Sequence, residues 1–190
     1  MVRMLSALLN QSSPPTEIHV VDDGSTQGAY VEERDWFIRQ AALAGIYASW
    51  QRTPNEGRRH AQVHGFRKIR HADLFMTVDS DSMLDAEALH EIVQPFSDPR
   101  VMSVAGVILA INNRENLLAR VTDVIFVGQQ LIDRSFMSQL GSVMVDSGGL
   151  AAYRCSILAE NIDTYLSESY LGRHVEFSDD SLLTLFALLH

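Results

Sequence analysis

Residues 74–82 read Leu-Phe-Met-Thr-Val-Asp-Ser-Asp-Ser, a nearly continuous apolar run that ends in a polar turn. A run of this kind is typical of a strand covered on both faces of a parallel sheet. The same pattern occurs at 17–25, where Glu-Ile-His-Val-Val is followed by Asp-Asp-Gly-Ser. Segments with the apolar spacing of helices separate such runs over the first two thirds of the chain. This alternation predicts an α/β fold with a mostly parallel sheet.

The remaining segments fit the same alternation. We predict helices at 29–44, 58–70, 85–95 and 115–139, strands at 46–50, 101–111 and 143–145, and a last helix after Ser178. The chain opens on a helix although each later helix follows a strand, and it stops within an apolar helical run. We therefore expect one domain, 1–190, truncated at both ends.

The composition is that of an ordinary globular domain, with 46% hydrophobic and 21% charged residues among 190. The 15 basic and 24 acidic residues give a net charge of −9, which opposes binding to a nucleic-acid backbone. A phosphorylated small molecule stays compatible if acidic residues hold a divalent cation. The single cysteine, Cys155, cannot form a disulfide within the chain, which fits a reducing compartment. No apolar run reaches the ~18–20 residues of a membrane span.

Two acidic pairs follow predicted strands: Asp22 with Asp23, and Asp79 with Asp81. The carboxyl ends of parallel strands form the edge at which ligands bind in open α/β sheets, so we expect both pairs to face one crevice. Carboxylates there can bind ribose hydroxyls or a uracil ring, and paired ones can hold Mg²⁺ or Mn²⁺ against a diphosphate. The alternative is that these residues only form turns and helix caps.

Three further segments carry candidate chemistry. Arg58 and Arg59 begin a predicted helix, where an anion is favoured, although a solvated basic face explains them equally well. The Ser147-Gly148 step places flexible backbone beside a hydroxyl, which suits close approach of a substrate or an ordinary turn. Asp180, in the pair with Asp179, is a candidate general base, and helix capping is its alternative role.

Taken in order, these motifs resemble the inverting family 2 glycosyltransferases, and most closely the hyaluronan synthases, chitin synthases and nodulation chitooligosaccharide synthases. The resemblance covers nearly the whole chain. It rests on the segments Val20-Val21-Asp22-Asp23-Gly24-Ser25, Gly57-Arg58-Arg59-x-Ala61-Gln62, Val78-Asp79-Ser80-Asp81, Ser147-Gly148-x-Leu150-x-x-Tyr153-Arg154 and Asp179-Asp180-x-x-Leu183-Thr184.

The resemblance implies a nucleotide-sugar-binding domain of the GT-A type, which is Rossmann-like. It implies that Asp22 and Asp23 lie at the uridine of a UDP-sugar, and that Arg58 and Arg59 lie near the diphosphate. Asp79 and Asp81 match the Asp-x-Asp motif that binds donor and metal, Mg²⁺ or Mn²⁺, with Asp81 the better candidate ligand. Ser147 and Gly148 match a segment near the acceptor pocket, and Asp180 matches the catalytic base.

The activity implied is transfer of a sugar, N-acetylglucosamine or glucuronate or both, from a UDP-sugar to a growing polysaccharide such as hyaluronan or a chitin-like polymer. The family's first strand, its Gln-x-x-Arg-Trp segment and its membrane helices have no counterpart in the chain. The resemblance therefore implies a parent protein held in the cell membrane through those other parts, with this domain on the cytosolic face. The family's glycine before the acidic pair is replaced by Ser178, which bears on acceptor specificity.

Two other interpretations compete with this one. A phosphoacceptor receiver domain also has acidic residues after two strands. The 57 positions between Asp22 and Asp79 are too many for that compact fold, and no strand-end lysine follows. A catalytically silent domain that binds a nucleotide through the same crevice fits the sequence as well as an enzyme does.

Overall fold

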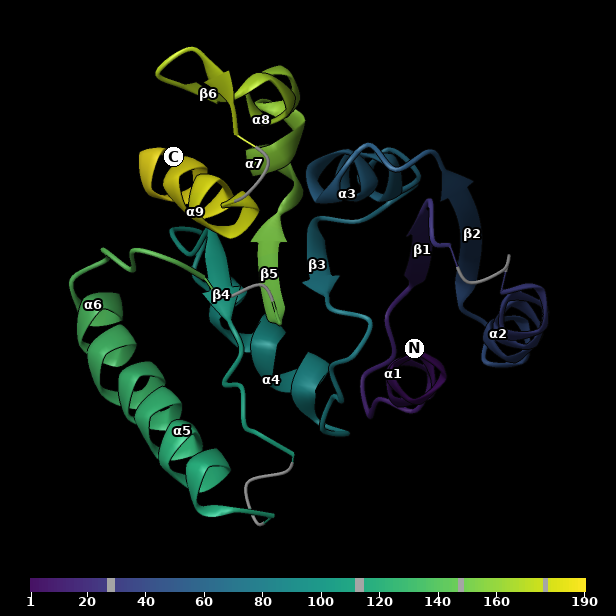
Figure 1. Ribbon diagram of the computed structural model, residues 1–190, viewed down its shortest axis with the longest axis horizontal. Coiled ribbons are helices and arrows are strands. Elements are labelled where there is room, and N and C mark those ends of the chain that lie inside the picture. The colour runs from purple at the N-terminus through teal and green to yellow at the C-terminus, as the bar shows by residue number, and fades with distance from the viewer. Residues whose placement is uncertain (27–29, 112–114, 147–148, 176–177) are drawn as a thin grey trace.

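The computed structural model describes residues 1–26, 30–111, 115–146, 149–175 and 178–190 (Figure 1). The first unit contains α1 (Val2–Leu9), β1 (Glu17–Asp23), α2 (Val31–Leu43) and β2 (Tyr47–Thr53). The strands are parallel and fully in register, from Glu17 opposite Tyr47 to Asp23 opposite Thr53. Apolar side chains of both helices pack on β1, with Leu5 and Phe37 completely buried. The predicted strands and helices of this unit are confirmed.

A second sheet has the order β3 (Leu74–Val78), β5 (Leu150–Arg154), β4 (Ser103–Ala105). The middle strand, β5, runs antiparallel to both neighbours. The chain is therefore a mixed α/β protein whose parallel pairing, within the described residues, is that of β1 with β2. The strand β3 has the bounds that its apolar run predicts.

Two strand predictions need correction. The strand expected at 101–111 is only Ser103–Ala105 long, since the backbone of 108–110 bonds to side chains of a helix instead of another strand. The strand expected at 143–145 is not formed, and the sheet is completed by β5. That strand was missed because its Leu-Ala-Ala-Tyr-Arg sequence has no β-branched residue.

Several helices surround the sheets between and after these strands. They are α3 (Arg58–Phe66), α4 (Ala88–Val93), α7 (Cys155–Ala159), α8 (Ile162–Ser167) and α9 (Asp179–Leu189), and α4 continues directly as the 3-10 helix η1 (Gln94–Ser97). A short hairpin of β6 (Ser169–Tyr170) and β7 (Arg173–His174) precedes α9. The second core lies where α7, α8 and α9 meet β5, around the fully buried rings of Tyr153 and Tyr165. This packing fixes the start of α9, which carries Asp179 and Asp180.

The helix predicted at 115–139 forms a single arm made of α5 (Leu117–Gly128), a π-helical turn η2 (Gln129–Arg134) and α6 (Ser135–Gln139). Figure 1 shows it along one side of the molecule. Two of its polar side chains face inward: Asp123 accepts from the Ala110 amide at 2.7 Å, and Gln130 bonds both backbone groups of Ile108. Among the described residues, no helix has the length and apolar composition needed to cross a bilayer.

Candidate functional site

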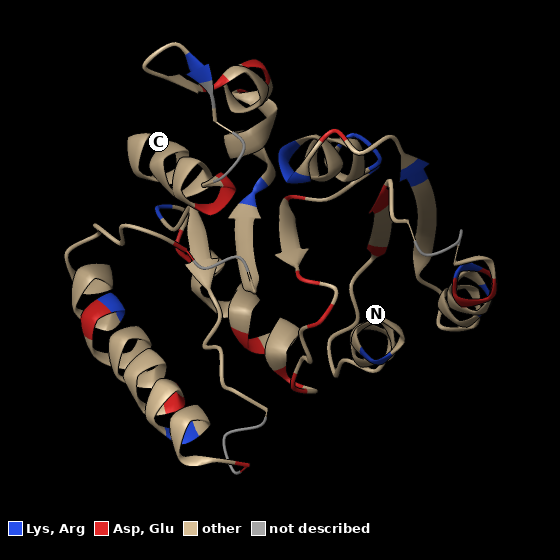
Figure 2. Ribbon diagram, in the orientation of Figure 1, with Lys and Arg blue, Asp and Glu red and all other residues tan. Residues whose placement is uncertain are grey.

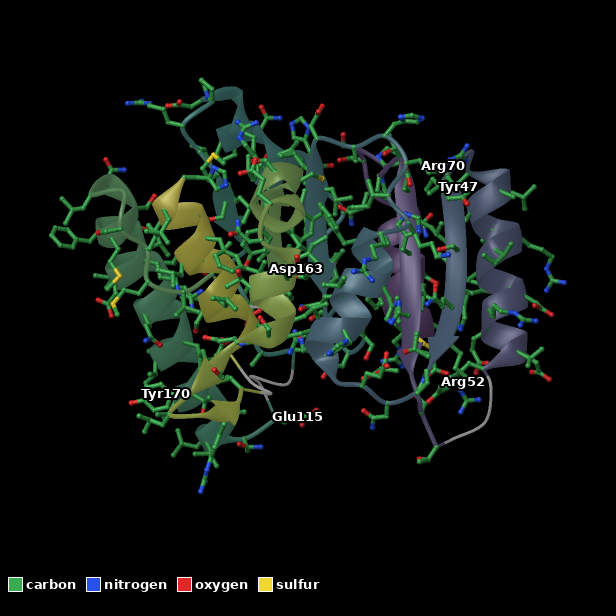
Figure 3. All side chains as sticks on the ribbon, turned by 90° about the horizontal axis from the view of Figure 1, so that it is seen from above. Tyr47, Arg52, Arg70, Glu115, Asp163 and Tyr170 are labelled. Atoms are coloured by element: carbon green, nitrogen blue, oxygen red, sulfur yellow. The ribbon has the colours of Figure 1, made fainter. Side chains whose placement is uncertain are left out.

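The carboxyl ends of β1, β2 and β3 meet at one edge, beside the start of α3. Asp23, the last residue of β1, accepts hydrogen bonds from the backbone amides of Glu56 and Gly57, both at 3.0 Å. The next residue, Arg58, reaches Asp79 just beyond β3. Figure 3 shows Arg52 at this end of β2 and Tyr47 with Arg70 at the other. The expectation that both acidic pairs lie at one edge agrees with this geometry.

Asp22 is buried and serves the turn after β1. Its Oδ1 accepts from the Ser25 amide at 2.9 Å, and its Oδ2 lies 3.6 Å from Nε of Arg52. Gly24 has a φ of 70°, which only glycine adopts without strain. A Cβ there would also lie 2.7 Å from the Asn55 backbone nitrogen. The first acidic pair is thus held by a close turn against the loop that follows β2.

Arg58 joins two acidic segments that are far apart in sequence. Its Nη2 donates to Asp79 Oδ1 at 2.5 Å, and its Nε lies 3.0 Å from Asp179 Oδ2. The arginine side chain is 46% exposed, so it faces solvent as well as both carboxylates. In Figure 2 the basic residues on α3 and the acidic residues at the start of α9 are drawn in blue and red.

Arg59 points the other way, into the protein. Its guanidinium pairs with Glu168, donates to the Tyr165 carbonyl at 3.3 Å and lies 5.4 Å from the centre of the Tyr165 ring. The residue is only 3% exposed. The expectation that both arginines lie near the diphosphate is therefore corrected. Arg58 faces the crevice, whereas Arg59 is buried and joins α3 to α8.

Gln62 and Tyr165 complete this part of the site, and neither is among the candidate site residues predicted from the sequence. Gln62 lies one helical turn after Arg58 and donates to Asp179 Oδ2 at 2.9 Å. The hydroxyl of Tyr165 donates to the Gln62 side-chain oxygen. The only sequence signal for Gln62 was its place at the end of the basic motif. Tyr165 gave none, because its role depends on the packing of α8 against α3.

Asp79 and Asp81 supply hard oxygen ligands of the kind that Mg²⁺ and Mn²⁺ prefer. Burial raises the pKa of Asp79, and the nearby carboxylates of Asp81 and Asp179 raise it further against the opposing effect of Arg58. Such crowding of negative charge favours a bound cation. Within the described part of the chain, no three potential ligand side chains form a metal site by themselves. The residues fit a divalent ion whose remaining ligands are substrate oxygens and water.

Asp180 is the second residue of α9, beside the second core. Its backbone carbonyl accepts from the Thr184 hydroxyl at 2.7 Å, and the same hydroxyl oxygen accepts from the amide of Asp146 at 2.9 Å. Asp146 is buried, which raises its pKa. Ser178, before the pair, has a φ of 70°, the conformation that suits a glycine. The candidates Ser147 and Gly148 lie outside the described residues.

A cavity of about 1070 Å³ lies between β1 and β3 and extends to α1. At the strand ends it is lined by Asp22, Asp23, Arg58, Asp79 and Asp81. Five of the predicted donor-site residues therefore line the same hollow. Asp180 is linked to this hollow through its neighbour Asp179, which Arg58 and Gln62 hold.

Comparison with known proteins identifies the family. The model of the family described as glycosyl transferase family 2 matches residues 1–162. The chain belongs to glycosyl transferase family 2. Among curated relatives of this family 2 chain, hyaluronan synthase of Streptococcus pyogenes is 32% identical over 189 residues, covering 99% of the chain and 45% of the relative.

A second relative is an N-acetylglucosaminyltransferase of Rhizobium meliloti, 30% identical over 186 residues, or 97% of this chain and 42% of the relative. The family 2 chain thus spans less than half the length of these relatives. A solved structure, mannosyltransferase PcManGT from Pyrobaculum calidifontis in complex with GDP-Man and Mn²⁺, matches with a TM-score of 0.64 and 19% identity. That match covers 94% of this chain and 45% of the other, and it establishes a common fold.

Proposed function

We propose that residues 1–190 form one catalytic domain of an inverting glycosyltransferase that takes a sugar from a UDP-sugar. The carrying observation is the hollow at the strand ends, where Asp22, Asp23, Arg58, Asp79 and Asp81 line one cavity. Carboxylates for a nucleoside, an arginine for phosphate and a carboxylate pair for a cation are the groups that a nucleotide-sugar requires. The name of the N-acetylglucosaminyltransferase relative supports N-acetylglucosamine as one donor sugar, and glucuronate, as a second or alternative donor, follows from the sequence resemblance alone.

In this proposal Asp22 and Asp23 bind the uridine, and Asp79 and Asp81 hold Mg²⁺ or Mn²⁺ against the diphosphate. The ion, when bound, stabilises the negative charge that grows on the departing UDP. Arg58 supports the same charge from the start of α3, where a helix terminus also favours an anion. Support for Arg58 is its exposed position in the cavity lining.

The chemistry needs one further group, a base for the acceptor. We assign this role to Asp180, whose carboxylate takes the proton of the acceptor hydroxyl as that oxygen attacks the anomeric carbon. The bond between this carbon and the diphosphate oxygen breaks in the same displacement, so the configuration inverts and UDP leaves. Ser147 and Gly148 are assigned to the acceptor pocket on the strength of the sequence resemblance alone.

The wider assignments follow the relatives. We propose a growing polysaccharide, hyaluronan or a chitin-like polymer, as the acceptor, and a parent protein held at the cytosolic face of the cell membrane by parts other than this chain. Two relatives, both more than twice as long as the chain, support this by name: one is a hyaluronan synthase and the other an N-acetylglucosaminyltransferase.

Calorimetric titration of UDP with and without Mn²⁺ tests the donor site. We expect UDP binding that depends on Mn²⁺, and loss of this metal-dependent binding in Asp81→Ala. The catalytic role is tested by Asp180→Asn, for which we expect a fall in sugar release from UDP-N-acetylglucosamine of about a thousandfold with UDP binding kept. Binding without any effect of Asp180→Asn would instead support the silent nucleotide-binding domain, and no binding by the folded chain would contradict the proposal.

A further inference from the structure

We propose that Arg58 is an exchangeable counter-ion: without donor it neutralises Asp79 and thereby competes with the divalent cation, and on donor binding it moves to the diphosphate. This inference rests on the proposed donor site. It goes beyond the assignment of Arg58 as a phosphate contact. Without donor the arginine competes with the metal ion for Asp79, and with donor bound it and the metal ion both bind the diphosphate.

The position of the guanidinium carries the first step. Its Nη2 donates to Asp79 Oδ1 at 2.5 Å, so it occupies one of the two carboxylate oxygens that Asp79 offers to a metal ion. A cation bound to that oxygen at about 2.1 Å would stand within a few ångströms of the guanidinium. At that separation two positive charges repel each other strongly even with partial screening. Arg58 and a metal ion therefore exclude one another from Asp79 Oδ1.

The surroundings of Asp179 carry the second step. Arg58 also contacts Asp179 Oδ2 at 3.0 Å, but that oxygen keeps a second donor, Gln62, at 2.9 Å. The Gln62 amide is fixed in turn by the hydroxyl of Tyr165, whose ring is completely buried. Departure of Arg58 thus leaves Asp179 hydrogen-bonded, while Asp79 is left needing a new counter-charge. A divalent ion supplies that charge.

The two adjacent arginines of the motif differ in exposure and therefore in freedom to move. Arg58 is 46% exposed at its side chain and can swing on a flexible stem, whereas Arg59 is 4% exposed and paired with Glu168. Arg59 therefore anchors the start of α3 to α8 while Arg58 moves. The destination is near, because the amino end of α3 and the metal-ligand pair line the same cavity.

The test measures Mn²⁺ alone and UDP with saturating Mn²⁺, by calorimetry and by the electron paramagnetic resonance signal of free Mn²⁺. For Arg58→Ala we expect affinity for Mn²⁺ alone to rise about fivefold and affinity for UDP with Mn²⁺ to fall about tenfold. A rise in Mn²⁺ affinity together with a fall in UDP affinity is the result that exchange of Arg58 between the two partners predicts. Arg34→Ala is the matched control, because this arginine on α2 is 44% exposed and paired with Asp35, away from the cavity. We expect less than a twofold change in either affinity there.

Unchanged or weaker binding of Mn²⁺ alone in Arg58→Ala would overturn the exchange. Arg58→Gln, which keeps the stem and a hydrogen-bond donor without the charge, gives the same comparison if the alanine variant unfolds. A rise in Mn²⁺ affinity with no UDP binding by any variant would uphold the competition at Asp79 and contradict the proposed donor site. The two ideas can therefore fail separately.

Discussion

The two acidic turns of this chain are built alike and held differently. Asp22 and Asp23 precede Gly24, and Asp179 and Asp180 follow Ser178, and both turn residues have a φ of 70°. Asp23 takes its two shorter hydrogen bonds from backbone amides of the loop after β2, and the Thr53 hydroxyl adds a third at 3.3 Å. Asp179 takes its hydrogen bonds from the side chains of Arg58 and Gln62.

Backbone donors cannot leave without unfolding a loop, whereas side-chain donors can. The first turn is therefore part of the scaffold, and the second belongs to a charged cluster whose partners can be exchanged. The same residue type at similar places thus acquires different chemistry from the groups that face it. The following substitutions compare the two turns, starting with the largest expected effect.

Gly24→Ala should be the most damaging change. Its φ of 70° penalises any side chain, and the new Cβ would lie 2.7 Å from the backbone nitrogen of Asn55. We expect a loss of about 3 kcal/mol in the free energy of unfolding, measured with urea. Gly45→Ala is the control, since its φ is 72° but no atom lies within 4 Å of the added Cβ. A loss of only about 1 kcal/mol is expected there, and equal losses would refute the steric argument.

Asp23→Asn and Asp179→Asn apply one change to both turns. At Asp23 the substitution weakens two charge-assisted bonds from backbone amides, and we expect a loss of about 2 kcal/mol in unfolding free energy. At Asp179 the loss should be below about 1 kcal/mol, because removing this charge relieves its repulsion of Asp79. Denaturant unfolding at pH 7 measures both. A larger loss at Asp179 would show that the second turn is the more rigid one.

Asp146→Asn tests the buried charge behind the second turn. Burial raises the pKa of Asp146 above its ordinary value of 3.8, so ionisation of this group costs stability as pH rises through the folded-state pKa. The asparagine variant should be more stable than the native chain by about 1 kcal/mol at pH 7. The gain should vanish below pH 3.8, where the aspartate is neutral in both states. Thermal unfolding at several pH values measures it, and a gain independent of pH would exclude the charge as its cause.

Ser178→Gly is the smallest effect and has the opposite sign to Gly24→Ala. Glycine relieves the left-handed conformation at φ 70°, and we expect a gain of about 0.5 kcal/mol in unfolding free energy. Differential scanning calorimetry measures the shift in melting temperature. A loss would mean that the serine side chain stabilises the start of α9 by more than the backbone strain costs.

The sequence predicted the fold best where one local signal was strong. The apolar run before Asp79 gives β3 its observed bounds, and the turn residues after Val21 mark the end of β1 closely. Prediction failed at β5, where small residues form a central strand only because β3 and β4 flank it. It failed also at 143–145, where an apolar pattern suited to a strand has no strand partner, and Met144 is left exposed.

For the site, the order of motifs in the sequence picked out Asp22, Asp23, Arg58, Asp79 and Asp81 as candidates, and these five residues line one cavity. Sequence could not distinguish Arg58 from Arg59, because adjacent residues of one type look alike until a helix turns them by about 100°. That rotation buries Arg59 and exposes Arg58. Nor could it find Tyr165, which reaches Gln62 across 103 positions of chain.

By itself, then, the sequence determined the family, the α/β alternation and the residue types at the strand ends, since these depend on short apolar runs and on turn chemistry. Only the tertiary structure decided which carboxylates are held by backbone amides and which share an arginine side chain. The physical reason is that a charge is defined by its neighbours within a few ångströms. Those neighbours come from α3, β3, α8 and α9, which are distant in sequence and meet only in the folded chain.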